Sequence, residues 1–257
     1  MRSISPGGVG GGQGEEKMTQ TQTAAALLAT ATAAAGGLTY AALSAQSQLF
    51  GPVLIASRNP SEIALTYDDG PNDPHTLKVL QILAKHNVKA TFFMIGRYAQ
   101  QRPDIAREVA RAGHAIGNHT FTHPLLTFKS DAEIRRELSG CRAALSDAVG
   151  QHTNLFRPPF GGRRPAVLRI ARSLGMEPVM WNVTGYDWTA PPASVIKGKV
   201  AKQVRGGDVI LLHDGGHKAM GANRSPTVAA TDQLLTSYKA AGYDFVTIPR
   251  MMSSHAK

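Results

Sequence analysis

The sequence predicts an α/β protein in which strands and helices alternate, folded as a distorted (β/α) barrel with about seven strands. Three observations lead to this prediction. Beyond Arg58, short apolar runs alternate with amphipathic stretches, an order typical of parallel β/α architecture. The chain has 257 residues, a length that a single barrel commonly uses. Polar clusters follow several apolar runs, at the strand ends where barrel enzymes carry their active sites.

Apolar or β-rich runs predict strands at residues 63–67, 90–95, 115–117, 155–156, 178–182, 208–212 and 245–247. Helical periodicity predicts helices at residues 75–86, 101–112, 130–149, 165–174, 194–204 and 227–241. Local signals support several boundaries. Pro103 stands in a first helical turn, and Ser130 and Glu133 form a capping-box pattern. Gly175 and Gly242 follow helix ends, where glycine commonly terminates a helix.

The beginning of the chain differs from the rest. Residues 1–17 are polar and rich in glycine, which predicts a flexible tail. Residues 18–57 contain no Asp, Glu, Lys or Arg, and within them residues 23–45 are mostly Ala, Leu, Thr and Gly, long enough to span a bilayer. Three interpretations stay open: a membrane anchor, a signal peptide cleaved near residues 42–45, or an Ala-rich soluble helix.

We expect export or anchoring, because Lys17 precedes the apolar segment and would leave the following domain outside the cytoplasm. The true start could be Met1 or Met18, and the second choice removes Lys17. The expected organisation is a flexible tail, then a signal peptide or membrane anchor that associates with the membrane through residues 23–45, then a folded domain; the boundaries are 1–17, 18–48 and 49–257.

Composition restricts the partners. A formal net charge of +10 attracts polyanions without naming one. The Lys and Arg residues are dispersed, and no basic stripe is studded with aromatic residues, so we expect no nucleic-acid partner. An anionic polymer of the cell envelope fits this charge better. The single cysteine, Cys141, cannot form an internal disulfide and is expected to fill space in the core.

Two polar clusters predict a metal centre. Asp68 and Asp69 follow the first strand, and adjacent residues at a strand end point in different directions. One carboxylate can therefore bind a cation while the other acts as a base. His119 and His123, four residues apart, can meet one metal if their segment forms a helical turn. Two imidazoles with Asp69 would leave positions open for water and substrate, as catalytic sites do.

Three further clusters follow later strands. Arg157, in the segment RPPF, can hold a carboxylate through two hydrogen bonds. Asp187 and Trp188 lie in a loop, where they could orient a histidine and wall an apolar pocket. His213 ends the strand at residues 208–212, and an imidazole at a barrel mouth suits general-acid work.

In this order, the segments TYDDG, HTFTH, RPPF, TGYDW and LLH resemble the five motifs of the polysaccharide deacetylase family that shares the NodB homology domain, carbohydrate esterase family 4. The family motifs read TFDDG, H(S/T)xxH, RxPF/Y, DxxDW and LxH. The resemblance covers about residues 60–250. It implies a NodB-like barrel and makes residues 49–257 a polysaccharide deacetylase catalytic domain.

The resemblance also implies a role for each motif residue. Asp69, His119 and His123 hold a divalent metal, usually zinc. Asp68 is the general base that takes a proton from the metal-bound water, and Arg157 steadies it. This division agrees with chemistry, because an amide carbonyl is a poor electrophile that a metal must polarise.

On the leaving-group side, the resemblance implies that His213 protonates the sugar nitrogen and that Asp187 tunes His213. Trp188 and Leu211 line the pocket that takes the acetyl methyl, and the backbone amide of Phe160 helps to stabilise the oxyanion. An acid is needed here because an amine leaves badly unless it is protonated.

The chain departs from the family pattern at a few positions. Tyr67 replaces the commoner Phe, and Thr184 stands where the first Asp of DxxDW usually lies. The segment at residues 215–225 is long for its place, and we interpret His217 within it as a loop residue rather than a ligand. Five other histidines are interpreted as ordinary surface or helix-end residues: His75, His86, His114, His152 and His255.

The resemblance implies metal-assisted hydrolysis of N-acetyl groups on a polymer that contains N-acetylglucosamine, with peptidoglycan expected first and chitin-type oligomers second. Expected export would place this activity outside the cytoplasm. Two alternatives stay open. The same chemistry would attack O-acetyl esters of xylan more easily than amides, and a catalytically silent barrel could bind carbohydrate. Loss of the base or of a metal ligand would mark the silent barrel, and none is lost here.

Overall fold

The structure is a computed structural model that describes residues 20–255, and the chain divides into two compact units, Met1–Thr39 and Tyr40–Lys257. The predicted tail at residues 1–17 and the alternative start Met18 lie outside the described residues. The segment that follows contains a long helix, α1 (Gln20–Leu43). No helix within residues 20–255 combines the length and apolar content needed to cross a membrane. The membrane span predicted at residues 23–45 is therefore not supported.

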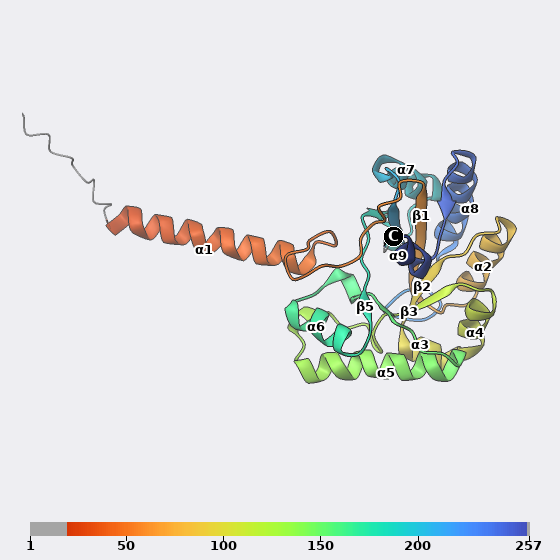
Figure 1. The fold of residues 1–257 in the computed structure, drawn as a ribbon, viewed down its shortest axis with the longest axis horizontal. Coiled ribbons are helices and arrows are strands. Elements are labelled where there is room, and N and C mark those ends of the chain that lie inside the picture. Colours follow the sequence, from red (N-terminus) through yellow and green to blue (C-terminus); the bar gives the residue numbers. More distant parts are fainter. Residues whose placement is uncertain (1–19, 256–257) are drawn as a thin grey trace, which may run out of the picture. The chain divides into compact units, whose positions relative to one another are not determined.

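The strands of the second unit form one parallel sheet that curls into a half-barrel (Figure 1). Along the sheet the order is β5-β4-β3-β2-β1-β7-β6, and β8 also pairs with β1. The bounds are β1 (Glu62–Gly70), β2 (Thr91–Met94), β3 (Ala115–Asn118), β4 (Leu155–Phe156), β5 (Glu177–Pro178), β6 (Val183–Thr184), β7 (Asp208–His213) and β8 (Asp244–Phe245). The predicted distorted (β/α) barrel is confirmed.

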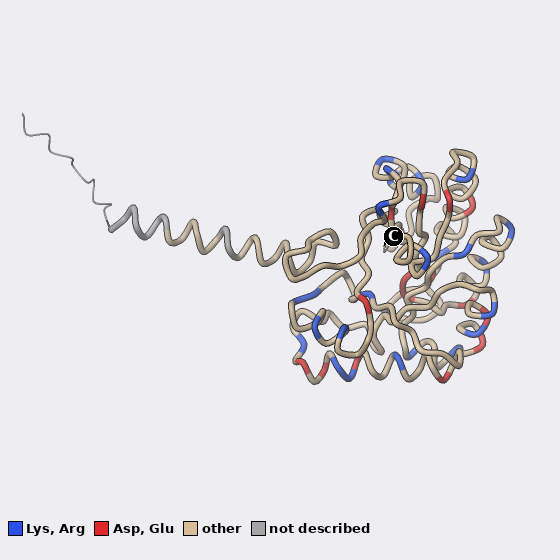
Figure 2. The backbone as a smooth tube through the Cα atoms, viewed as in Figure 1, with Lys and Arg blue, Asp and Glu red and all other residues tan. Residues whose placement is uncertain are grey.

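Helices cover the outside of the sheet, and neighbours contact one another in the order α7, α8, α2, α4, α5 and α6. Figure 1 shows this ring around the strands. The bounds are α2 (His75–Lys85), α3 (Gly96–Gln101), α4 (Pro103–Arg111), α5 (Asp131–Val149), α6 (Pro165–Ser173), α7 (Ala193–Gln203) and α8 (Ser225–Ala240). The capping box predicted at Ser130 and Glu133 is confirmed at the start of α5. Figure 2 shows Lys and Arg dispersed among Asp and Glu over these helices.

Strand β1 divides its side chains between two cores. Ile63, Leu65 and Tyr67 pack outward against the helices, in the larger core cluster. Ala64 faces the other way and packs with Val209, in a cluster that also contains Ile248 and Met251 of α9 (Ile248–His255). Because side chains alternate along a strand, Thr66 and Asp68 share the inward face with Ala64. The strand therefore carries its first carboxylate into the barrel interior.

The structure corrects three predictions of elements. The helix expected at residues 101–112 is α4, with Pro103 in its first turn as predicted, but a separate short helix, α3, precedes it and was not predicted. The strand expected at residues 178–182 is regular only to Pro178; Val179 still forms a bridge to Leu54, while the carbonyls of Val179 and Met180 accept hydrogen bonds from Arg157. Helix α9 has no counterpart in the prediction.

Buried side chains outside the strand ends include Cys141, which is fully buried in α5 as predicted. His75 and His114 are buried as well; His75 begins α2, in line with its interpretation as a helix-end residue, and neither lies on the surface. Nδ1 of His114 accepts a hydrogen bond from the backbone N–H of Ala90 at 3.1 Å, and Nε2 of His75 lies 3.2 Å from the hydroxyl of Ser225. Each buried imidazole thus has a polar partner within the protein in place of water.

The second unit starts at Tyr40, before the domain boundary predicted at residue 49. Contacts of Arg163 show that residues between Tyr40 and residue 49 contribute to the packing of the second unit. The guanidinium of Arg163 is 1% exposed and donates to the carbonyls of Ser44 and Ser47 at 2.8 and 2.7 Å, and to that of Gly161 at 3.0 Å. Residues 44–47 thus satisfy a buried charge beside the turn that carries Phe160.

Deleting residues 1–48 is expected to destabilise the barrel more than deleting residues 1–39, because the longer deletion removes two of the three acceptors of Arg163. An unsatisfied buried group costs on the order of 1–3 kcal/mol, and more when it is charged. The melting temperature should fall by about 2–4 °C per kcal/mol lost. Thermal denaturation of both truncated chains measures this, and equal melting temperatures would contradict the role given to residues 44–47.

Candidate active site

The predicted polar clusters meet at the carboxyl ends of neighbouring strands, as the strand register requires. Asp68 of β1 lies opposite His213 of β7. On the other side, Asn118 at the end of β3 pairs with Phe156 of β4, so His119 and Arg157 follow at adjacent positions. Carboxyl ends of parallel strands form the usual place for an α/β active site. All ten residues singled out from the sequence lie here.

Asp69, His119 and His123 form a cluster with the composition of a metal site. Their candidate ligand atoms all lie within 4.8 Å of one another. Oδ1 of Asp69 is 3.2 Å from Nε2 of His123 and 3.6 Å from Nε2 of His119. The Nδ1 atom of His119 lies 2.8 Å from the carbonyl oxygen of Arg157, to which it can donate, so Nε2 keeps its lone pair for a cation.

The electrostatics of this cluster also fit a cation. All three residues are buried. Among the described residues, Oδ1 of Asp69 has no hydrogen-bond partner, which is unusual for a buried carboxylate oxygen. Burial lowers the pKa of His119 to about 4, against the opposing effect of Asp68, and so keeps the imidazole neutral. Burial alone would raise the pKa of Asp69, but contacts with His123 and His217 hold it well below its usual range.

Asp68 is held by a buried arginine that reaches across the barrel. Nη1 of Arg157 donates to Oδ1 of Asp68 at 2.8 Å and to the hydroxyl of Thr66 at 2.8 Å. The other nitrogens donate to the carbonyls of Val179 and Met180, and the guanidinium is fully buried over the ring of Phe93. The second oxygen of Asp68, Oδ2, faces Nε2 of His119 at 3.6 Å. One oxygen of Asp68 is thus fixed while the other faces the metal cluster.

His213 and Asp187 form the second ionisable pair. Nδ1 of His213 lies 2.8 Å from Oδ1 of Asp187, whose Oδ2 accepts from the His213 backbone N–H and from the hydroxyl of Thr227. Burial opposes protonation of His213, but Asp187, aided by Asp69 and Asp68, outweighs it and raises its pKa to about 9. The imidazole therefore carries a proton near neutral pH, with Nε2 as its remaining donor.

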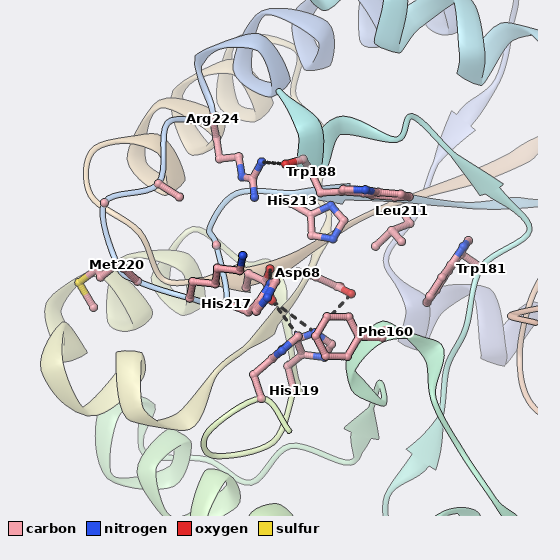
Figure 3. Close-up of a pocket in the computed structure, with 17 residues that line it drawn as sticks. Asp68, His119, Phe160, Trp181, Trp188, Leu211, His213, His217, Met220 and Arg224 are labelled. Atoms are coloured by element: carbon pink, nitrogen blue, oxygen red, sulfur yellow. Dashed lines mark hydrogen bonds and ion pairs between the residues drawn. The ribbon is translucent and has the colours of Figure 1, made fainter. Parts of the chain in front are cut away.

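A cavity of about 790 Å³ opens over these groups (Figure 3). Both carboxylates, His213 and the two imidazoles of the metal cluster line it, while Arg157 and Asp187 lie behind them. Phe160 and Trp188, each about half exposed, stand at its walls, and Leu211 forms part of its floor. The rings of Trp188 and His213 form a T-shaped contact, with centres 5.7 Å apart.

Several site residues adopt left-handed backbone conformations that side chains other than glycine rarely take. The φ angles are 74° at Asp69, 63° at His123 and 57° at Phe160. Such conformations cost on the order of 1–3 kcal/mol each and persist where the surroundings enforce them. At Asp69 the conformation follows the extended backbone of Asp68, so the two neighbouring carboxylates serve different partners.

Sequence reasoning missed four residues of the site. His217 lines the cavity beside Asp69; it is a loop residue rather than one of the candidate ligands, as predicted, but its place in the site was not. Trp181 lines it too. Arg224 is buried and donates to the carbonyl of Trp188 at 3.1 Å. Burial raises the pKa of Asp214, the residue after His213, to about 7. The strand-end position of Asp214 directly after His213 was the one available signal.

Comparison with known proteins gives a consistent result. Residues 56–179 match the family described as Polysaccharide deacetylase. A chitooligosaccharide deacetylase of Azorhizobium caulinodans is 34% identical over 208 residues, which cover 78% of this chain and 99% of that protein. A peptidoglycan-N-acetylglucosamine deacetylase of Bacillus cereus is 37% identical over 196 residues, covering 76% and 89%.

Solved structures share the fold. A peptidoglycan N-acetylglucosamine deacetylase in complex with a naphthalenyl N-oxidanyl-benzamide superposes with a TM-score of 0.72 and 35% identity, covering 77% of this chain and 91% of that one. A pseudoenzyme of carbohydrate esterase family 4 from Bacillus anthracis superposes equally well, with a TM-score of 0.72 and 30% identity, covering 79% and 69%. Likeness of fold therefore does not by itself separate active from inactive members, and the site residues must do so.

Proposed function

Because this chain belongs to the polysaccharide deacetylase family, we propose that it removes N-acetyl groups from a polymer containing N-acetylglucosamine, with Asp68 as base and His213 as acid. The observation that carries the proposal is the pair of opposed ionisable groups. Asp68, held by Arg157, and His213, held by Asp187, flank the Asp69 cluster on neighbouring strands. Carbohydrate binding alone would need neither pair.

Asp69, His119 and His123 would hold a divalent metal, for which we propose zinc, since two imidazoles and one carboxylate suit it. When bound, such a metal polarises the acetyl carbonyl and makes water a stronger acid. Oδ1 of Asp69, which has no hydrogen-bond partner among the described residues, and Nε2 of His119, whose Nδ1 can donate to the Arg157 carbonyl, support this assignment.

The protein's own residues would then move two protons. Asp68 accepts a proton from the attacking water at Oδ2, while Arg157 keeps Oδ1 occupied and the carboxylate oriented. His213 delivers its Nε2 proton to the departing sugar nitrogen, since Asp187 occupies Nδ1. Leu211 and Trp188 would enclose the acetyl methyl, and Phe160 would present its backbone amide to the developing oxyanion.

Peptidoglycan and chitin-type oligomers are the proposed substrates, because the relatives named above are deacetylases of chitooligosaccharide and of peptidoglycan. The aromatic side chains that line the cavity, Phe160, Trp181 and Trp188, suit the apolar faces of sugar rings. A substrate in the cell wall places the proposed activity outside the cytoplasm.

Acetate release by the full chain, with zinc present, tests this function. We expect release from N-acetylglucosamine oligomers or peptidoglycan, and loss of that release after treatment with a chelator. Acetylated xylan serves as the competing substrate. Release from xylan alone would replace the N-deacetylase with an O-acetyl esterase, and no release from any of the three would favour a barrel that only binds carbohydrate.

The pH dependence should report on His213. The pKa of His213, about 9, predicts that activity falls as the pH rises through this value, because the acid loses its proton. A bound cation nearby lowers the pKa of His213 and so moves this alkaline limit of activity to lower pH. Asp187→Asn removes the main charge that raises the pKa, so the alkaline limit of kcat should shift to still lower pH. A full pH profile of kcat measures the shift.

Thr227→Val is the matched control, because it removes a hydroxyl that donates to Asp187 but keeps the carboxylate. Its alkaline limit should stay close to that of the wild type. An unchanged limit in Asp187→Asn would mean that His213 does not supply the proton.

A further inference from the structure

We infer that His217, in the loop after β7, is a positioning residue for the metal site: it holds the outer oxygen of Asp69 and covers His123, and so retains the bound metal. The inference rests on the proposed metal site, but it does not depend on the deacetylase activity. Figure 3 shows the His217 side chain directed toward Asp68 and His119 rather than away from the cavity.

The first step concerns the two oxygens of Asp69. Oδ1 faces both imidazoles of the metal cluster, at 3.2 Å from His123 and 3.6 Å from His119. Oδ2 faces Nδ1 of His217 at 3.8 Å, a polar contact that is longer than a hydrogen bond. A ligand carboxylate whose second oxygen has a polar partner keeps its orientation, and such outer partners typically change metal affinity 10–100-fold.

The second step concerns His123. The rings of His217 and His123 are stacked, with centres 4.8 Å apart and an angle of 19° between the planes. The ring of Phe160 packs nearly perpendicular to both rings, with its centre 4.7 Å from that of His123 and 5.1 Å from that of His217. The side chain of His123 is only 4% exposed, whereas that of His217 is 36% exposed. His217 is therefore the outer layer that separates a metal-site imidazole from solvent.

The third step is that the loop holding His217 is fixed on both sides. The carbonyl oxygen of His217 accepts hydrogen bonds from Nη2 of Arg97 at 2.6 Å and from the hydroxyl of Tyr98 at 3.2 Å. Two residues earlier, a Cβ on Gly215 would lie 2.0 Å from the Asp69 carbonyl oxygen, so only glycine allows this close approach. Nε of Arg224 donates to the Gly215 carbonyl at 2.6 Å. These contacts place the imidazole without help from a ligand.

His217 is not proposed as a fourth ligand. The atoms that lie within 4.8 Å of one another belong to Asp69, His119 and His123, and His217 stands outside that group. Its contact is with the far oxygen of Asp69. The number of coordinating protein atoms should therefore stay the same when His217 is removed, and this separates the two roles.

Zinc titration against a competing chelator, with the full chain and no substrate, tests the inference. His217→Ala should weaken zinc binding by about 10–100-fold. Lys218→Ala, at the adjacent exposed position of the same loop, should bind zinc like the wild type. In cobalt-loaded protein, the visible absorption bands should report the same coordination number in His217→Ala as in the wild type.

Unchanged zinc affinity in His217→Ala would overturn the inference, as would equal weakening in Lys218→Ala, which would point to the loop as a whole. A change in cobalt coordination number would overturn it in favour of direct ligation. A wild-type chain that binds no zinc would instead refute the proposed metal site, so the two failures are distinguishable.

Discussion

Asp68→Asn is expected to lower kcat for deacetylation by a factor of about 10²–10⁴, the usual contribution of a general base. The amide is close in size to the carboxylate, and its oxygen can still accept from Nη1 of Arg157. The fold should therefore survive, while the proton acceptor at the second oxygen is lost. Steady-state kinetics of acetate release measure the change, and circular dichroism establishes that the variant is folded.

Asp147→Asn is the matched control, because Asp147 is exposed on α5 and away from the site. Its kcat should equal that of the wild type. If Asp68→Asn kept the wild-type kcat, another group would have to accept the proton, and the assignment of Asp68 would be wrong.

Arg157→Met should cost about 3–5 kcal/mol of unfolding free energy, the typical effect of removing one partner from a buried ion pair. The guanidinium is fully buried, and its loss leaves Asp68 without a cation and two backbone carbonyls without donors. Arg157→Lys keeps the charge but cannot reach all of these acceptors at once, so a smaller loss is expected. Urea denaturation of both variants measures the difference.

Arg169→Met removes an equally short ion pair, to Asp131, but both side chains are at least half exposed. Such a surface pair contributes about 0–1 kcal/mol, so this control should be nearly neutral. If Arg157→Met and Arg169→Met lost the same unfolding free energy, burial would not explain how much the Arg157–Asp68 pair contributes to stability. Because domains are stable by only about 5–15 kcal/mol, Arg157→Lys keeps the test measurable if Arg157→Met does not fold.

The site was largely predictable because its residues sit at strand ends. Asp68, His119 and His213 each follow a run whose pattern predicts a strand, and parallel strands end at one edge. The sequence does not reveal which strands are neighbours, so the placement of Asp68 opposite His213 in β1 and β7 came only from the structure. The same holds for Arg157, which reaches Asp68 across 89 positions of the chain.

The features that escaped prediction depend on contacts with no periodic pattern. The apolar run predicts a strand at residues 178–182, but the regular strand stops at Pro178, and the carbonyls of Val179 and Met180 accept hydrogen bonds from Arg157. His217 stands in an irregular loop, where spacing carries no information about direction. Its position depends on the approach of Gly215 to Asp69 and on the anchoring of its carbonyl by Arg97.

The central claim is that Asp69, His119 and His123 hold a metal on which deacetylation depends. Zinc added stepwise to chelator-treated protein, with acetate release measured at each addition, tests it most directly. We expect no release without zinc, and a rise that ends at one zinc per chain, both in the wild type and in His152→Ala, which alters an exposed histidine. His119→Ala should stay inactive at that ratio. Full acetate release by the metal-free wild type would contradict the claim.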